Sequence, residues 1–346
     1  MRVALAQIDC FLGDTEGNLS KSKEVVAEAR DRGADPTVFP ELSLSGYALE
    51  ELDDDVAIEA QSEPISSLAE AAGEMAVVVG FCEEGRGFHN YNSAAYLEGG
   101  VLRHLHRKLY LPNYRIYEER KHYNPGQSMR AFDTRFGRMA MLICNDAWQP
   151  FLPFIAVQDG AQVLIIPANS GSYPYPELLD TRGYWRGITR FYARMLESYV
   201  IFVNRVGKQD NLIFWGYSHV VDPWGTVVAE APVHEEALIT VDIDLGNVRR
   251  RRREVPLVKE ARLAGQGIES SRRRRRGSRI GNTSALHVKL TGPCRIDPNR
   301  NSTPPSRASS KGTCALTKLH GPCGPRMPPS TSASPLASSS PARRRT

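Results

Sequence analysis

Long apolar runs and closely spaced cysteines are both missing from this sequence. Nowhere in its 346 residues do about 18 apolar residues follow one another, as a membrane-spanning helix requires. The first apolar run, from Val3 to Ile8, is too short for a secretory signal peptide. The 6 cysteines include no Cys-x-x-Cys pair, which excludes a disulfide scaffold and argues against structural zinc. These absences predict a cytoplasmic protein with no membrane partner.

Aromatic residues are missing from the last third of the chain. None follows Trp224. Residues 1–248 contain 21 Lys and Arg against 35 Asp and Glu, a net charge of −14, whereas residues 249–346 contain 23 against 4, a net charge of +19. A highly charged segment without large apolar rings cannot bury enough surface to offset the entropy of ordering. We therefore predict one folded domain, residues 1–263, followed by a disordered Arg-, Ser- and Pro-rich tail, residues 264–346.

Two arginine runs, Arg249–Arg253 and Arg272–Arg276, raise the alternative of a nucleic-acid-binding protein, because clustered arginines bind phosphate. Aromatic residues between the charges or a known RNA-binding module would support that function. The tail has neither, so we favour a solvated extension without a nucleic-acid partner. A late change of reading frame is a further hypothesis for its origin.

The folded domain alternates strand-like and helix-like segments. Short apolar runs bounded by Gly, Pro and Asn predict strands, and longer amphipathic segments predict helices. Leu19–Arg32 is one such helix, with Asn18 as its expected N-cap and Gly33 as its end. About ten strands with helices between them predict an α/β fold whose sheets carry helices on their outer faces. The strands are expected at residues 3–8, 37–39, 75–81, 92–97, 101–107, 139–144, 163–166, 199–203, 217–221, 227–229 and 237–243, and further helices at 153–160 and 185–197.

Glu41, Lys108 and Cys144 each stand where one of these apolar strands ends. In sheets covered by helices, strand ends bring residues that are distant in sequence close together. A thiol becomes a nucleophile when a base takes its proton, and a carboxylate can return that proton to a leaving amine. An ammonium group and a backbone N–H stabilise the negative charge that forms when an amide or nitrile is attacked. We therefore expect Cys144 as nucleophile, Glu41 as base, and Lys108 with the amide of Asn145 as stabilisers.

Each residue alone has a simpler explanation. Cysteine is among the most buried residue types, and the other two could be ordinary surface charges. The surrounding motifs are more specific: Phe39–Tyr47 (FPELSLSGY), Arg107–Pro112 (RKLYLP) and Leu142–Trp148 (LICNDAW). In order and spacing they resemble the nitrilase (carbon-nitrogen hydrolase) superfamily over about residues 1–263. The resemblance is strongest to free-standing amidases related to the glutaminase portion of glutamine-dependent NAD synthetase.

The resemblance implies a four-layer αββα sandwich and a homodimer or higher homo-oligomer. It makes Glu41 the general base, Lys108 the group that stabilises the tetrahedral intermediate, and Cys144 the residue that forms a thioester or thioimidate. No metal or organic cofactor is predicted, because thiol, carboxylate and ammonium fill every role.

The resemblance also adds Glu119, which stands six residues before Pro125-Gly126. A second carboxylate there could orient Lys108 or, through like-charge repulsion, shift the pKa of Glu41. The alternative is a surface charge balanced by Arg120 and Lys121.

Four further residues are candidates for binding the substrate. Asn145 stands where the family usually has Glu or Tyr, and its backbone N–H is the functional group. Asn169 and Ser170 belong to a segment that resembles the family's pocket wall, and Tyr114 lies in a loop expected to line the pocket. The predicted reaction is hydrolysis of a carbon-nitrogen bond in a small amide. A glutaminase subunit that supplies ammonia to a separate synthetase, an N-carbamoyl amine amidohydrolase and a catalytically idle binding protein remain alternatives.

Overall fold

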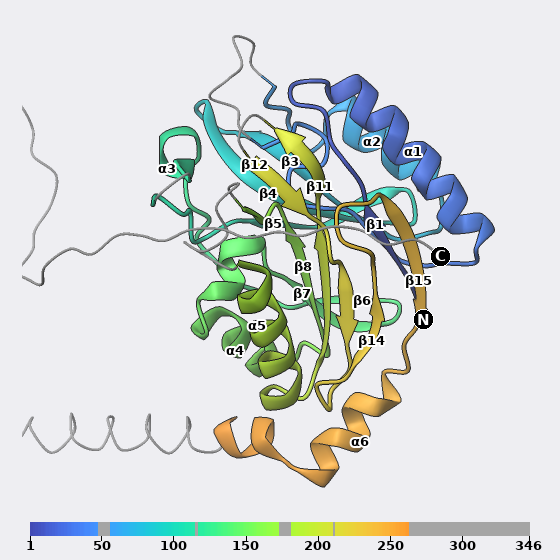
Figure 1. Cartoon of the computed structure of the whole chain (residues 1–346), viewed down its shortest axis with the longest axis vertical. Helices are drawn as coiled ribbons and strands as arrows, with labels where there is room; N and C mark the ends of the chain where they lie inside the picture. Colours follow the sequence, from blue (N-terminus) through green and yellow to red (C-terminus); the bar gives the residue numbers. More distant parts are fainter. Residues whose placement is uncertain (48–55, 115–116, 173–180, 210–211, 263–346) are drawn as a thin grey trace, which may run out of the picture. The chain divides into compact units, whose positions relative to one another are not determined.

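Two six-stranded sheets form the body of the domain in a computed structural model of the chain (Figure 1). The structure describes residues 1–47, 56–114, 117–172, 181–209 and 212–262, all within one compact unit, Met1–Thr283. The predicted tail, residues 264–346, lies outside the described residues, so its disorder stays a prediction.

The first sheet joins strands from both ends of the domain. They are β1 Arg2–Gln7, β2 Thr37–Val38, β3 Val77–Gly85, β4 His89–Glu98, β5 Val101–Arg107 and β15 Ala237–Asp242. Their order is β15-β1-β2-β3-β4-β5. β1, β2 and β3 are parallel, whereas β15 is antiparallel to β1. The strands β3, β4 and β5 form an antiparallel meander. The residue before Lys108 is therefore the last of an edge strand.

The second sheet has three parallel strands at its centre. Its strands are β6 Phe132–Thr134, β7 Gly137–Met141, β8 Val163–Ala168, β10 Tyr199–Asn204, β13 His219–Val221 and β14 Val227–Glu230. The order is β14-β13-β10-β8-β7-β6, and β7, β8 and β10 are parallel. A small third sheet contains β9 Gly171–Ser172, β11 Val206–Gln209 and β12 Leu212–Trp215.

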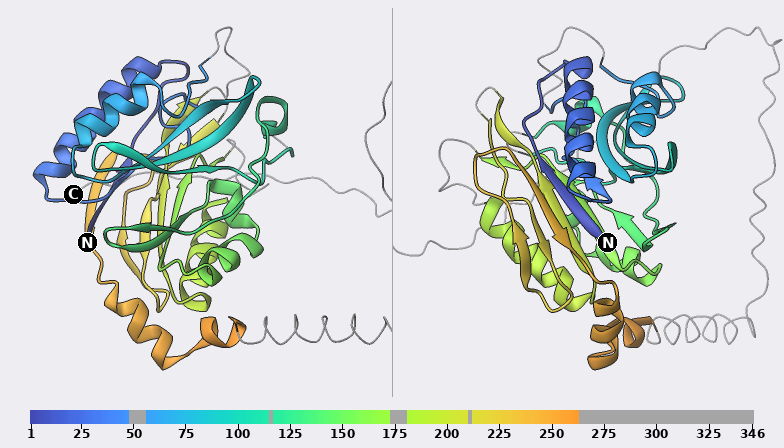
Figure 2. Two further views of the ribbon diagram at one scale, coloured as in Figure 1. Left: turned by 180° about the vertical axis from the view of Figure 1, so that it is seen from behind. Right: turned by 90° about the vertical axis from the view of Figure 1, so that its right-hand side faces the viewer.

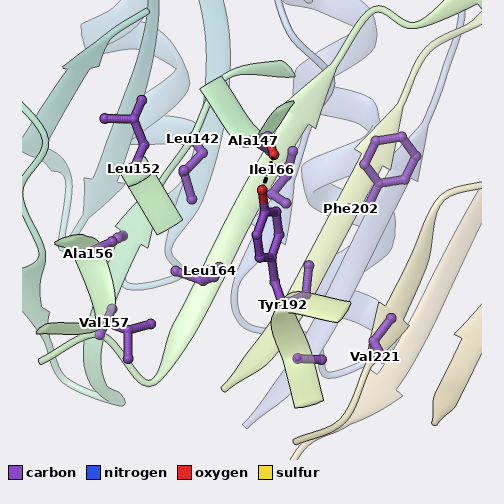
Figure 3. Close-up of a cluster of buried hydrophobic side chains, with 14 of the residues drawn as sticks. Leu142, Ala147, Leu152, Ala156, Val157, Leu164, Ile166, Tyr192, Phe202 and Val221 are labelled. Atoms are coloured by element: carbon purple, nitrogen blue, oxygen red, sulfur yellow. Dashed lines mark hydrogen bonds between the residues drawn. The ribbon is translucent and has the colours of Figure 1, made fainter. Parts of the chain in front are cut away.

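Alternation along the buried strands separates two apolar layers. In β8, Val163 and Ile165 pack between the two sheets, against first-sheet residues such as Val78. Leu164 and Ile166 point the other way, onto α4 (Phe151–Gln158) and α5 (Thr181–Met195); Figure 3 shows this outer cluster. Because successive side chains of a strand face opposite sides, an unbroken apolar run supplies both layers at once.

Helices α1 (Thr15–Asp31) and α2 (Glu63–Ala72) cover the outer face of the first sheet (Figure 2). Val26 and Leu68 from these helices share a cluster with Val77 and Val79 of β3. Each such buried side chain stabilises the fold by about 1.5–3 kcal/mol. The layers therefore run helix, sheet, sheet, helix, which confirms the predicted αββα sandwich.

The predicted N-cap of α1 is wrong. The side chain of Asp14 caps the helix by accepting from the Gly17 N–H at 2.8 Å. Asn18 is buried inside the helix, and its side-chain amide pairs with the backbone N–H and C=O of Phe11 at 2.9 and 2.7 Å. The local sequence allows Asn18 either to cap the helix or to lie within its first turn. The hydrogen bonds to Phe11 place it within the helix.

The first arginine run lies in a helix, α6 (Gly246–Glu254). Arg252 donates to the carbonyl of Ala161 at 2.8 Å and to Ser198 at 3.1 Å. This arginine run therefore packs on the folded domain, although it is positively charged like the predicted tail. The sequence also did not indicate α2 or the short strands β6, β9, β11 and β12. None of the helices within the described ranges is long and apolar enough to cross a membrane.

Candidate active site

Glu41, Lys108 and Cys144 meet where their strands end, and Glu119 joins them from the first turn of α3 (Glu119–His122). The Nζ of Lys108 lies 2.7 Å from Glu41 Oε1 and 2.7 Å from Glu119 Oε1. All three side chains are buried. Burial alone would lower the pKa of Lys108, but the carboxylates of Glu119 and Glu41 outweigh it and hold that pKa well above its usual value. The cluster therefore contains a buried ammonium between two carboxyl groups.

Glu41 is held by donors from three separate elements. Besides Lys108, the side-chain amide of Asn92 donates to Oε1 at 2.7 Å and the backbone N–H of Asn169 donates to Oε2 at 2.7 Å. The side-chain amide of Asn169 also donates to the Glu41 carbonyl at 2.7 Å. These contacts fix the carboxylate in one orientation, as a general base requires.

Glu119 is buried, so the alternative of a surface charge balanced by Arg120 and Lys121 is wrong. Its Oε1 accepts from Lys108 and, at 2.6 Å, from the Tyr47 hydroxyl. Its Oε2 is also buried and has no hydrogen-bond partner among the described residues. Burial raises the pKa of the Glu119 carboxyl to about 7, although Lys108 and Tyr47 donate hydrogen bonds that lower it.

Cys144 follows the end of β7 and begins a 3₁₀-helix, Cys144–Trp148. Its φ of 43° is in the left-handed region, which costs of order 1–3 kcal/mol for a residue with a side chain and occurs mainly at functional sites. Burial raises the pKa of the thiol well above its usual value and the charge of Glu41 raises it further, against the opposing effect of Lys108. The cysteine is therefore a thiol at neutral pH and needs a base to react.

A model of the family described as carbon-nitrogen hydrolase matches residues 2–253. The chain belongs to this family. Hydrolases of this family act on carbon-nitrogen bonds, and this chain is a carbon-nitrogen hydrolase with the family's fold and motifs.

Named relatives fall into two groups. The N-carbamoylputrescine amidase of Solanum lycopersicum is 30% identical over 266 residues, which cover 72% of this chain and 88% of that protein. The glutamine-dependent NAD(+) synthetase of Thermotoga maritima is 34% identical over 256 residues, which cover 71% of this chain and 42% of that protein. This carbon-nitrogen hydrolase therefore spans less than half the length of that synthetase. The crystal structure of a carbon-nitrogen hydrolase from Helicobacter pylori G27 has the same fold, with a TM-score of 0.70, 22% identity and coverage of 76% of this chain and 96% of that one.

The four residues predicted to bind the substrate lie beside the cluster but make different contacts. Asn169 contacts Glu41 through both its backbone and its side-chain amide, and its Oδ1 is buried without a partner among the described residues. The backbone N–H of Ser170 donates to Asn204 Oδ1 at 2.8 Å. The side-chain amide of Asn145 donates to the Tyr110 carbonyl at 3.0 Å, and its Oδ1 accepts from the half-exposed Tyr114 hydroxyl at 3.4 Å. Their contact with the substrate stays a prediction.

Sequence reasoning assigned no role to Tyr47 or Asn92, although Tyr47 donates to Glu119 and Asn92 donates to Glu41. Tyr47 is the last residue of the motif that contains Glu41, and Asn92 lies in β4 beside the end of β5. A buried strand asparagine was a usable signal, because buried polar side chains are nearly always hydrogen-bonded.

Gly80 of β3 allows the loop that carries Glu41 to approach the sheet. A Cβ on Gly80 would press on the Leu42 N–H and lie 2.8 Å from the Pro40 carbonyl oxygen. We expect Gly80→Ala to displace Glu41 and lower kcat by on the order of 10²-fold, as a misplacement of about 1 Å does. Gly187→Ala on α5, where a Cβ meets nothing within 4 Å, is the control and should keep wild-type kcat. Wild-type kcat in Gly80→Ala would show that the loop does not depend on this contact.

The raised pKa of Glu119 predicts a pH-dependent stability. The folded protein keeps this proton up to a pH of about 7, whereas the unfolded chain releases it near a pH of about 4.3. Between these values ionisation favours unfolding, so the contribution of Glu119 to stability falls as pH rises. Glu119→Gln removes the effect, and its free energy of unfolding relative to wild type should rise by about 3 kcal/mol from pH 5 to pH 8. Urea denaturation of both proteins at each pH measures this; parallel pH profiles would contradict it.

Proposed function

We propose that the protein is an amidase that hydrolyses a small amide through a Cys144 thioester. The observation that carries the proposal is the buried ammonium of Lys108, fixed at 2.7 Å from two carboxylates beside a strained, protonated cysteine. Thiol, base and fixed cation are the groups that acyl transfer through a thioester requires.

In the proposed first half-reaction, Glu41 takes the Cys144 proton as the sulfur attacks the carbonyl carbon. The negative charge that develops on the carbonyl oxygen is stabilised by Lys108 Nζ and by the N–H of Asn145, which lies in the first turn of the 3₁₀-helix and so has no partner within it. When the tetrahedral intermediate collapses, Glu41 returns the proton to the leaving nitrogen and the C–N bond breaks. In the second half-reaction Glu41 takes a proton from a water that attacks the thioester carbonyl. The C–S bond breaks, the acid leaves, and Glu41 returns the proton to the Cys144 sulfur.

For the substrate, we propose a small amide whose leaving group is ammonia, with glutamine and an N-carbamoyl amine as the two candidates. The relatives support both, because one group is named for glutamine and the other for N-carbamoylputrescine. If glutamine is the substrate, the ammonia would serve a synthetase reaction of the kind for which the Thermotoga maritima relative is named. We further propose that residues 1–263 form the catalytic domain and that it acts as a homo-oligomer.

Ammonia release from glutamine, asparagine, an N-carbamoyl amine and a nitrile, measured side by side with the full chain, tests the proposal. We expect turnover of glutamine or of the N-carbamoyl amine and little with the nitrile. No ammonia from any of the four would contradict the proposed amidase.

A further inference from the structure

The carboxylate of Asp146 lies between the strand ends that carry Lys108 and Cys144. It is fully buried and accepts four hydrogen bonds. Oδ1 accepts from the backbone N–H groups of Leu109 and Tyr110, both at 2.9 Å. Oδ2 accepts from the backbone N–H of Ile143 at 3.1 Å and lies 2.9 Å from Nε2 of His106. Because a carboxylate only accepts, Nε2 is the protonated nitrogen of this histidine.

The four donors flank both functional residues. Leu109 directly follows Lys108, and Ile143 directly precedes Cys144. Lys108 follows β5 at the edge of the first sheet, whereas Cys144 follows β7 of the second. Stacked sheets share no ladder of backbone hydrogen bonds, so side chains must link these two strand ends. Asp146 does so through four hydrogen bonds, and the side-chain amide of Asn145 adds one to the Tyr110 carbonyl.

This link bears on one part of the proposed chemistry. The two groups that would stabilise the oxyanion come from the two strand ends that Asp146 joins. Lys108 Nζ comes from the end of β5, and the Asn145 N–H comes from the turn after β7. The base has further anchors, since Glu41 accepts not only from Lys108 but also from Asn92 and Asn169, neither of which contacts Asp146. A change at Asp146 should therefore disturb oxyanion stabilisation more than thiol deprotonation.

We propose that Asp146, together with His106, is a positioning pair that sets the two oxyanion-stabilising donors relative to the Cys144 sulfur. The inference rests on the proposed function and adds residues to which the motifs assigned no role.

The test is Asp146→Asn in the full chain, with two measurements. We expect kcat to fall on the order of 10²-fold with KM changed by less than about threefold, because an amide replaces one acceptor oxygen and moves the donors apart. Alkylation of Cys144 by iodoacetamide builds no oxyanion, and its rate should stay within about threefold of wild type. A residue that merely stabilises the fold would lower both rates in parallel.

Glu197→Gln is the matched control. Glu197 is also fully buried and accepts from two backbone N–H groups, those of Leu257 and Val258, at 3.4 and 3.5 Å. The same change of carboxylate to amide should lower stability there and leave both rates unchanged. Wild-type kcat in Asp146→Asn, or a parallel loss of turnover and alkylation, would overturn the inference.

His106 provides a second route in case Asp146→Asn does not fold. His106→Gln keeps an N–H donor within reach of Oδ2, whereas His106→Leu removes it. We expect His106→Gln to retain several-fold more kcat than His106→Leu at similar alkylation rates, and equal kcat values would contradict the pair. Absence of amide turnover in the wild-type protein would refute the proposed function. Turnover in the wild type, with kcat unchanged in the variants, would refute only the positioning pair.

Discussion

Replacing Cys144 with alanine is expected to reduce ammonia release by at least about 10⁴-fold, to the uncatalysed background. The variant has no sulfur atom to form the thioester, and a water molecule in its place would be a much weaker nucleophile. The fold should survive, because the side chain is only partly buried and the substitution removes a single sulfur atom. Steady-state ammonia release from the substrate identified in the panel, with circular dichroism as a check of folding, measures this.

The matched control is Cys10→Ala. Cys10 is buried in the cluster under α1, and burial raises the pKa of its thiol to about 11, so it is a protonated core residue. We expect wild-type kcat and a small loss of stability from this variant. Equal rates in wild type and Cys144→Ala would instead support the alternative of a catalytically idle binding protein.

Replacing Lys108 with methionine is expected to lower kcat by at least about 10³-fold, because it removes the proposed oxyanion-stabilising donor and the cation between the Glu41 and Glu119 carboxyl groups. It should also lower the free energy of unfolding by about 3–5 kcal/mol, since Glu41 and Glu119 are then buried together without a counter-charge. Activity and stability are best compared at pH 6. Lys108 lowers the pKa of Glu119, which is about 7 in the wild type, so in the variant this pKa is higher, Glu119 is protonated at pH 6 and the repulsion is smallest.

Lys21→Met is the control for the loss of a paired lysine. Lys21 lies 2.5 Å from Glu236 in a pair that is partly exposed, and such pairs contribute about 0–1 kcal/mol. We expect no change in kcat from this variant. Substantial turnover in a folded Lys108→Met protein would show that the ammonium does not stabilise the intermediate.

Much of the fold was predictable because its buried strands are apolar along their whole length. Runs such as Val163–Ile166 and Tyr199–Val203 read as strands and supply both the inter-sheet layer and the layer under α4 and α5. The weakly predicted parts are those whose local pattern is ambiguous. The short strands β9 and β12 form by pairing with each other, and Asn18 is placed by its hydrogen bonds to Phe11. Both depend on contacts between segments and not on a local pattern.

The sequence by itself determined the three motifs, the positions of most main strands along the chain and the roles proposed for Glu41, Lys108 and Cys144, since these depend on residue type and spacing along the chain. Tertiary structure alone decided that Glu119 is a buried partner of Lys108, that Tyr47 and Asn92 hold the two carboxylates, and that Asp146 joins the two sheets. The physical reason is that a hydrogen bond acts over about 3 Å between residues that can be far apart in sequence, as Glu41 and Asn169 are. Which donors surround a buried carboxylate is therefore settled only when the strands carrying them pack together.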